Sequence, residues 1–139
     1  MKYLLDTNII SELITKEPNE KVITFFRTMS SRSLYLSVIT IGEIKFGIES
    51  LPDSRKKKKL LDWLYDDLFH RFGGRIVDVD SDIMIKWGYL NAILKKKGKP
   101  MPIMDAIIAA TAISQNFTLI TRNEKDFSNL DIEIVNPFN

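Results

Sequence analysis

Carboxylate side chains stand beside apolar segments of this chain at widely separated positions. Asp6 directly follows the short apolar run of residues 3–5, Glu43 lies beside the apolar stripe of its segment, and Asp105 stands within PIMDAIIAAT. A carboxylate in apolar surroundings is costly unless it is paired, caps a helix or binds a metal ion. Converging carboxylates also raise each other's pKa, which indicates either acid–base chemistry or a site for a hard cation. Mg²⁺ and Mn²⁺ prefer such oxygen ligands, together with water and substrate phosphate.

The composition excludes most other kinds of catalytic site. The chain of 139 residues has no cysteine and a single histidine, His70. It therefore has no disulfide scaffold, no thiol nucleophile and no zinc-finger or iron–sulfur ligands, and it lacks the second histidine of a two-histidine ribonuclease. A bound divalent ion can activate water and stabilise the charge that develops on a phosphodiester, so that no nucleophilic side chain is needed.

The spacing of apolar residues predicts the elements that must position these carboxylates. Short apolar runs, typical of buried strands, alternate with apolar residues at helical spacing. Strands are expected at about residues 3–5, 34–38, 75–79, 118–121 and 132–135, and helices at about 9–17, 22–29, 41–51, 54–71, 81–97 and 105–115. This alternation predicts a parallel sheet with helices on both faces. The length and the ordinary globular composition predict a single domain over residues 1–139.

The expected sheet brings the candidate residues toward one edge. In an open parallel sheet, ligands bind beyond the carboxyl ends of the strands. The polar residues expected at that edge are Asp6, Thr7 and Asn8 after the first strand, Glu43 and Asp105 on the following helices, and Thr121, Arg122, Asn123, Glu124 and Asp126 after the fourth strand. If these strands are adjacent, several carboxylates converge.

Each candidate also has a purely structural alternative. Asp6 and Asp105 could cap the helices that they precede. Glu43 could be an exposed helix residue, which is the commonest fate of a glutamate. Asp126 could only form a turn, and Arg122 could either meet phosphate or form a surface salt bridge.

Basic residues are concentrated in two runs. The net charge is only +2, but residues 55–59 and 95–99 together hold nine of the 20 lysines and arginines. Such a run is most often a solvated helix face, and the alternative is contact with a phosphate backbone. The run at 95–99 is closer in sequence to Asp105 and is therefore expected to be slightly better placed for RNA.

Four segments, taken in order, resemble the PIN-domain family. The segments are LLDTNIISEL, SVITIGEIKFGI, MDAIIAATA and LITRNEKDF. Within that family the chain is similar to the VapC/FitB-type toxins of bacterial toxin–antitoxin pairs, and GGRIVDVD and the closing NPF look like the FitB branch. The resemblance covers about residues 2 to 138. It implies a PIN-like three-layer sandwich, in which a central, mostly parallel five-stranded sheet is flanked by helices.

The resemblance also implies a function and a set of site residues. It implies an endoribonuclease that uses Mg²⁺, for which Mn²⁺ can substitute, and that leaves a 5′-phosphate and a 3′-hydroxyl. The first three acids of the family match Asp6, Glu43 and Asp105. The fourth acid of the FitB-like pattern falls at Asn123, where this chain departs from acid to amide, whereas many VapC-like chains carry an acid three residues later, which matches Asp126. Supporting side chains around the ligands would be Thr7, Asn8 and Thr121.

The partners implied are an RNA substrate, a cognate antitoxin protein and a second copy of the chain in a homodimer, which the antitoxin can build into a higher assembly. A cytoplasmic location is expected, because an acid at position 6 is wrong for a signal peptide and no apolar stretch is long enough to span a membrane.

Two other functions compete with this interpretation. A haloacid-dehalogenase-like phosphatase needs a second acid two residues after the first, and Asn8 stands there instead. A PIN domain weakened at Asn123 could bind RNA or its antitoxin without cleaving.

Overall fold

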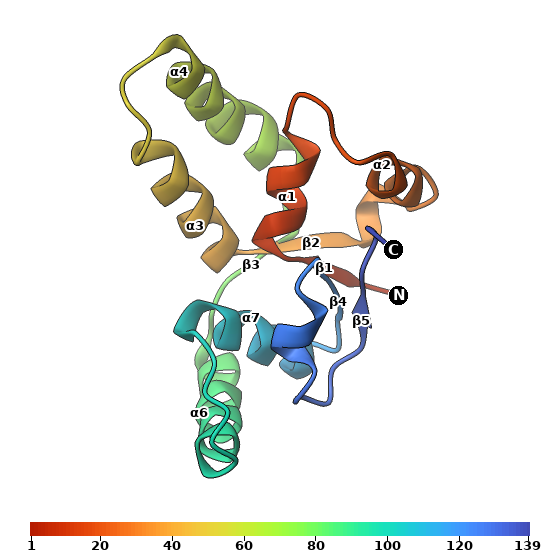
Figure 1. The fold of residues 1–139 in the computed structure, drawn as a ribbon, viewed down its shortest axis with the longest axis vertical. Coiled ribbons are helices and arrows are strands. Elements are labelled where there is room, and N and C mark those ends of the chain that lie inside the picture. The colour runs from red at the N-terminus through yellow and green to blue at the C-terminus, as the bar shows by residue number, and fades with distance from the viewer.

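The computed structural model describes all of residues 1–139 and contains one five-stranded sheet (Figure 1). The strands are β1 (Tyr3–Leu5), β2 (Leu34–Ser37), β3 (Ile76–Val77), β4 (Thr118–Ile120) and β5 (Ile134–Val135). Their order is β3-β2-β1-β4-β5, and every neighbouring pair is parallel. The predicted five-stranded parallel sheet is therefore confirmed, with β1 at its centre.

The register between β1 and β4 positions the residues that follow them. Leu5 lies opposite Ile120, and the backbone N–H of Asp6 donates to the carbonyl oxygen of Ile120 at 2.9 Å. Because both strands end at this pair, Asp6 and Thr121 emerge side by side at the carboxyl edge of the sheet.

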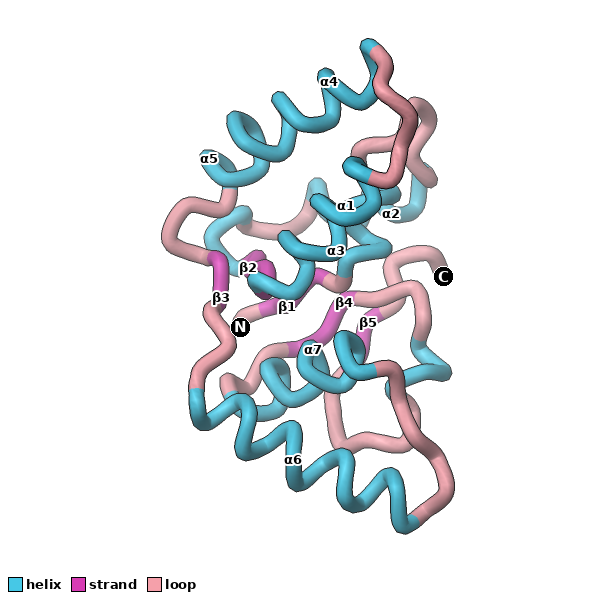
Figure 2. The backbone as a smooth tube through the Cα atoms, turned by 90° about the vertical axis from the view of Figure 1, so that its left-hand side faces the viewer, coloured by secondary structure: helices cyan, strands magenta, loops and turns pink.

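Helices cover both faces of the sheet, as Figure 2 shows. The helical elements are α1 (Thr7–Leu13), α2 (Glu20–Arg27), α3 (Val38–Glu49), α4 (Arg55–Asp62), the π-helical segment η2 (Trp63–Leu68), α5 (Phe69–Arg71), α6 (Ser81–Lys96) and α7 (Ile103–Ser114), with short 3₁₀ turns η1 (Ser31–Ser33) and η3 (Glu124–Phe127). In Figure 2, α1, α3, α4 and α5 lie on one side of the sheet, and α6 and α7 lie on the other.

Alternating side chains of the strands divide the core into two layers. Leu5 packs in a cluster with residues of α1, α3 and η2, whereas Leu4 packs with Ile108, Ala109 and Ala112 of α7. Successive side chains of a strand point to opposite faces, so a strand buried on both faces reads as a continuous apolar run. The short apolar run before Asp6 is therefore typical of a buried strand.

The predicted helices are confirmed, with corrections at their ends. The last long helix begins at Ile103, with Pro102 as its N-cap, and not at Asp105. The predicted start of α6 at residue 81 is confirmed, and its cap is Asp80, whose side chain accepts from the N–H of Ile83. Gly98, with φ of +68°, follows the end of α6 as expected, because glycine adopts this left-handed conformation at little cost. None of the helices combines the length and apolar character that crossing a membrane requires.

Candidate active site

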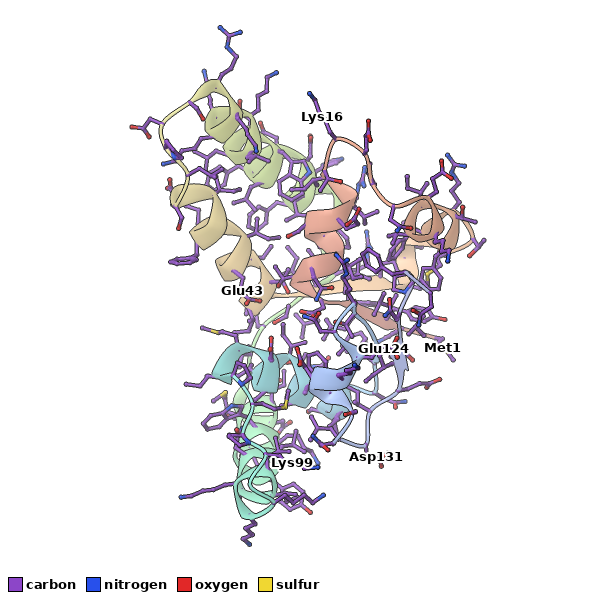
Figure 3. All side chains as sticks on the ribbon, viewed as in Figure 1. Met1, Lys16, Glu43, Lys99, Glu124 and Asp131 are labelled. Carbon is purple, nitrogen blue, oxygen red and sulfur yellow. The ribbon has the colours of Figure 1, made fainter.

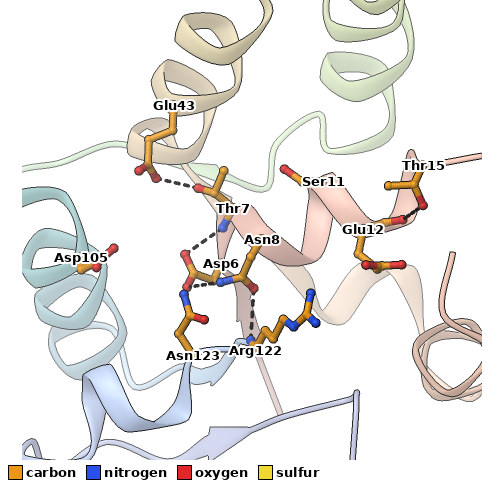
Figure 4. Close-up of a pocket in the computed structure, with 10 residues that line it drawn as sticks. All are labelled: Asp6, Thr7, Asn8, Ser11, Glu12, Thr15, Glu43, Asp105, Arg122 and Asn123. Carbon is orange, nitrogen blue, oxygen red and sulfur yellow. Dashed lines mark hydrogen bonds between the residues drawn. The ribbon is translucent and has the colours of Figure 1, made fainter.

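A polar pocket lies at the carboxyl edge of the sheet (Figure 4). Its cavity has a volume of about 440 Å³, and no hydrophobic side chain lines it. The lining residues are Asp6, which caps α1, Thr7, Asn8, Ser11 and Glu12 from α1, Thr15 just beyond its end, Glu43 from α3, Asp105 from α7, and Arg122 and Asn123 after β4. Residues up to 117 positions apart in the sequence therefore meet in one cavity, since 123 − 6 = 117.

Asp6 is buried and held by three donors. Its side chain is the N-cap of α1 and accepts from the Thr7 N–H at 2.8 Å. It also accepts from the Thr121 hydroxyl at 2.8 Å and from the Asn8 amide at 3.1 Å. Asp6 therefore does cap α1, but the hydrogen bonds from Thr121 and Asn8 are not part of the cap and fix the carboxylate in addition. Burial raises the pKa of Asp6 above its usual range, although these hydrogen bonds oppose the rise.

Glu43 is fixed to α1 and is not a free helix residue. It is half-buried, and the Thr7 hydroxyl donates to its Oε1 at 2.6 Å. The same hydroxyl lies 3.1 Å from the Thr40 hydroxyl. Because a hydroxyl carries one proton, the Thr7 proton goes to the carboxylate and Thr40 donates to Thr7. The exposed-helix alternative for Glu43 is therefore wrong.

Asn8 and Thr121 tie the end of β1 to the segment after β4. Asn8 accepts from the Arg122 N–H at 3.1 Å, and its amide lies 3.3 Å from the Thr121 hydroxyl. Thr121 is fully buried and accepts from the Asn123 N–H at 3.0 Å. These contacts hold the backbone around Asp6. Their positions are consistent with the supporting role predicted for Thr7, Asn8 and Thr121, which stays a prediction.

Asp105 faces the pocket without a hydrogen-bond donor (Figure 4). It is the third residue of α7, so the capping alternative is wrong. Just beyond it, seven consecutive buried residues, 106–112, pack α7 into the core, so Asp105 marks the point where this helix meets the pocket. Burial, and then the negative charges of Asp6, Glu43 and Asp126, raise the pKa of Asp105 to about 6. The carboxylates therefore converge closely enough to influence one another.

The two candidates for the fourth position differ in place. Asn123 lines the pocket, and Figure 4 shows its side chain pointing toward Asp6. Asp126 lies on the exposed turn η3 and does not line the pocket, although its charge raises the pKa of both Asp6 and Asp105. Asn123 is thus the nearer candidate ligand, whereas the charge of Asp126 influences the other carboxylates from outside the pocket.

Some of the lining residues were not among the expected site residues. Ser11 and Glu12 share one face of α1 with Asn8, opposite the buried Ile9 and Ile10, and Thr15 follows just after the helix ends. Polar residues at positions 8, 11, 12 and 15 follow helical spacing, and this periodicity is a signal that could have identified them.

Arg122 is the one cationic side chain that lines the pocket. It forms no salt bridge, since every ion pair of the structure involves Lys45 or Lys57. Its guanidinium instead lies 4.6 Å from the centroid of the Phe138 ring, a cation–π contact that leaves its donors free. The salt-bridge alternative is therefore wrong, and the phosphate alternative remains.

The donor set fits a hydrated divalent ion. No three acidic or histidine side chains are gathered into a closed ligand set. Mg²⁺ does not need one, because it is usually held by one or two carboxylates and keeps several waters. Asp6 and Asp105 supply carboxylates, Glu43 a third and Asn123 an amide oxygen, all at one open cavity. The neighbouring carboxylates help to raise the pKa of Asp105, and a cation would relieve this repulsion.

Comparisons with known proteins agree with this architecture. The PIN domain family matches residues 3–133. The chain is 33% identical to Toxin FitB of Neisseria gonorrhoeae over 97% of both chains, and 33% identical to VapC ribonuclease Y4jK of Sinorhizobium fredii over 97% of this chain and 96% of that one. The crystal structure of FitAcB from Neisseria gonorrhoeae superposes with a TM-score of 0.93 at 33% identity, covering 99% of each chain. That of VapBC2 from Rickettsia felis, bound to a promoter DNA fragment, has a TM-score of 0.82 at 27% identity and covers 98% of each.

Proposed function

The chain belongs to the PIN domain family, in the branch of FitB and VapC, and from this premise we propose that it is a metal-dependent endoribonuclease that acts as the toxin of a toxin–antitoxin pair. The observation that carries the proposal is the convergence of Asp6, Glu43 and Asp105 from separate elements onto one cavity without a hydrophobic side chain. The ribonuclease names of relatives such as VapC2 of Rickettsia felis support the substrate class.

The ligands of the ion would be Asp6, Glu43, Asp105 and Asn123, with Mg²⁺ or Mn²⁺ as the ion. When bound, it would supply an activated water and stabilise the negative charge that develops on the phosphodiester. The chain's own residues fix the geometry: Thr7 orients Glu43, while Thr121 and Asn8 hold the Asp6 carboxylate.

Arg122 would bind the phosphate. It lines the pocket, has no acidic partner and is supported by Phe138, so that its fork of donors is available for a phosphate oxygen. A phosphodiester drawn toward Arg122 would lie against the carboxylate pocket, where the reaction takes place.

The partner that we propose is a cognate antitoxin. The solved relatives are complexes such as FitAB and VapBC, and some of them are bound to DNA. A complex of this kind would keep the nuclease inactive until the antitoxin is lost. The homodimer, the higher assembly and the organisation of residues 1–139 as one domain stay predictions.

Binding without cleavage is the second candidate function, and the amide side chain at Asn123 favours it. An amide is a weaker ligand than a carboxylate for a hard cation. If this candidate holds, the natural chain leaves RNA intact and Asn123→Asp gains cleavage.

The deciding experiment is incubation of total bacterial RNA with the antitoxin-free chain and Mn²⁺ or Mg²⁺, read by sequencing of new 5′ ends. We expect new ends that require metal, disappear with a chelator and are absent with Asp6→Asn. Asp131→Asn is the matched control, because Asp131 is exposed and lies outside the pocket. Failure of a folded natural chain to produce new ends would overturn the proposal.

A further inference from the structure

A second groove adjoins the carboxylate pocket at Ser11 and Thr15. It has a volume of about 780 Å³, and its charged lining consists of Lys16, Arg55, Lys56 and Lys59, with no acidic residue. Ser11 and Thr15 line both the groove and the carboxylate pocket. The two cavities therefore form one continuous surface, acidic at one end and basic at the other.

Helix geometry selects which basic residues of the run 55–59 reach this groove. Arg55, Lys56 and Lys59 line it, whereas Lys57 turns away and binds Glu49 at 3.3 Å and Asp53 at 3.4 Å. Residues four apart share a helix face, so Arg55 and Lys59 lie one above the other. Lys57 alone of this run is neutralised by acids, and the cations of the groove have no acidic partner.

The start of α4 adds to the positive potential. Ser54 caps the helix, and no acidic residue lies in its first turn. The helix dipole places positive charge at this end, so lysines and an arginine there cost stability. A polyanion bound in the groove would offset that cost.

The other basic run is remote from the pocket. Lys95 and Lys96 end α6, and no residue of the run 95–99 lines the carboxylate pocket or the basic groove. Figure 3 places Lys16 and Lys99 toward opposite ends of the molecule, with Glu43 between them. The run at 95–99 therefore lines neither cavity, and its contact with RNA stays a prediction.

We propose that this basic groove binds the sugar-phosphate backbone of the single-stranded RNA on one side of the bond that is cleaved. The inference rests on the proposed function and adds the path of the substrate. The α1 helix spans only about 10 Å, so one strand can contact the groove and the carboxylate pocket together. Contacts of this kind neutralise phosphates without reading the sequence, so the groove would supply affinity while base selection occurs elsewhere.

The test measures RNA binding separately from cleavage. Fluorescence anisotropy with a labelled single-stranded RNA of mixed sequence is recorded in chelator, so that the strand stays intact. The triple variant R55Q/K56Q/K59Q is compared with K95Q/K96Q/K97Q, which removes equal charge from the remote run. We expect the groove variant to bind at least tenfold more weakly, with its log–log salt slope reduced by about 2, and the remote variant to change little.

A single-residue pair gives a control within one helix. Lys56→Gln should weaken RNA binding, and Lys57→Gln should not, although the two lysines are neighbours in the same run. Equal effects within this pair or between the triple variants would overturn the proposal. They would indicate that RNA binding depends on total positive charge and not on this groove.

An acidic protein segment is the competing occupant. Binding of a poly-glutamate peptide is measured on the same variants, and loss of peptide binding with unchanged RNA binding would also overturn the proposal. The proposed function is judged independently, from metal-dependent cleavage by the natural chain. If that chain cleaves RNA and the groove variant binds RNA normally, the groove inference fails while the nuclease stands.

Discussion

The two walls of the carboxylate pocket are built in different ways. On the wall formed by β1, α1 and β4, Asp6 accepts three hydrogen bonds and is 4% exposed. On the wall formed by α7, Asp105 is half-buried and accepts none, and its pKa is raised to about 6. One wall is braced by the protein, and the other carries much of the electrostatic repulsion.

This difference indicates how the site is prepared for a cation. The braced wall keeps its geometry whether or not an ion is bound, because backbone and side-chain donors satisfy it. The α7 wall lacks such partners, so its carboxylate gains most from a positive charge. A bound metal ion should therefore lower the electrostatic free energy most strongly at Asp105.

The largest effect is expected on cleavage. Asp6→Asn and Asp105→Asn should each lower kcat/KM by about 10³-fold, because each removes a charge that holds the ion. The measurement is single-turnover cleavage of a fluorescent RNA at saturating Mn²⁺. An Asp105→Asn variant with full activity would remove the α7 wall from the site.

Thr121→Val should weaken metal affinity by about 10–100-fold through loss of the brace on Asp6. The substitution conserves shape but removes the donor to Asp6 and the acceptor for the Asn123 N–H. Isothermal titration with Mn²⁺ measures the change, and Thr118→Val, at the opposite end of β4 from the pocket, is the control. Similar affinities for the two variants would show that the braced wall does not depend on its hydrogen bonds.

Metal affinity should fall as the pH drops below about 6. A proton competes with the ion for Asp105, whose pKa is raised, so affinity should decrease by up to about tenfold per pH unit below that value. The titrations are run between pH 5 and pH 8, values that bracket the pKa of Asp105. In Asp105→Asn this dependence should be absent near pH 6, and its persistence would assign it to another group.

The smallest effect is expected on stability without metal. At pH 7 Asp105 is ionised in both states, but its raised pKa means that the folded state disfavours the charge. The folded state therefore loses stability as the pH rises from about 4 to about 6, and Asp105→Asn should raise Tm at pH 7. A gain of about 1 kcal/mol, allowing for solvent screening, corresponds to about 4 °C.

The same substitution on the braced wall should not raise Tm. Asp6→Asn should bring no gain in Tm, because the new amide nitrogen would face the donors of Asn8 and Thr121. Thermal melts of both variants at pH 7 and pH 4 provide the comparison. Equal gains at pH 7 would contradict the asymmetry between the walls.

Much of the fold could be predicted from the sequence, because its signals are local. The run before Asp6 reads as a central strand since both of its faces are buried, and Gly98 marks the end of α6. The candidate acids followed from their places at the ends of these elements. The family resemblance then supplied their expected roles.

Other features depend on contacts between distant segments and have no local signal. The stacking of Arg122 on Phe138 joins residues 16 positions apart, since 138 − 122 = 16, and it removed the salt-bridge alternative. Likewise, the run 55–59 is uniformly basic in sequence, and only the packing of α4 against α3 turns Lys57 toward Glu49. The sequence shows that charge is present, whereas the fold decides which charge is free.

The π-helical segment η2 sets the rotational phase of the long helical stretch from Arg55 to Arg71. Leu64 and Leu68 within it and Phe72 after it anchor the stretch in the core, and before it, Arg55 and Lys59 face the basic groove. Deleting Trp63, the first residue of η2, would leave these anchors in place but rotate the basic face by about 100° relative to them. Insertions and deletions among natural relatives should therefore avoid this segment even where individual side chains vary freely.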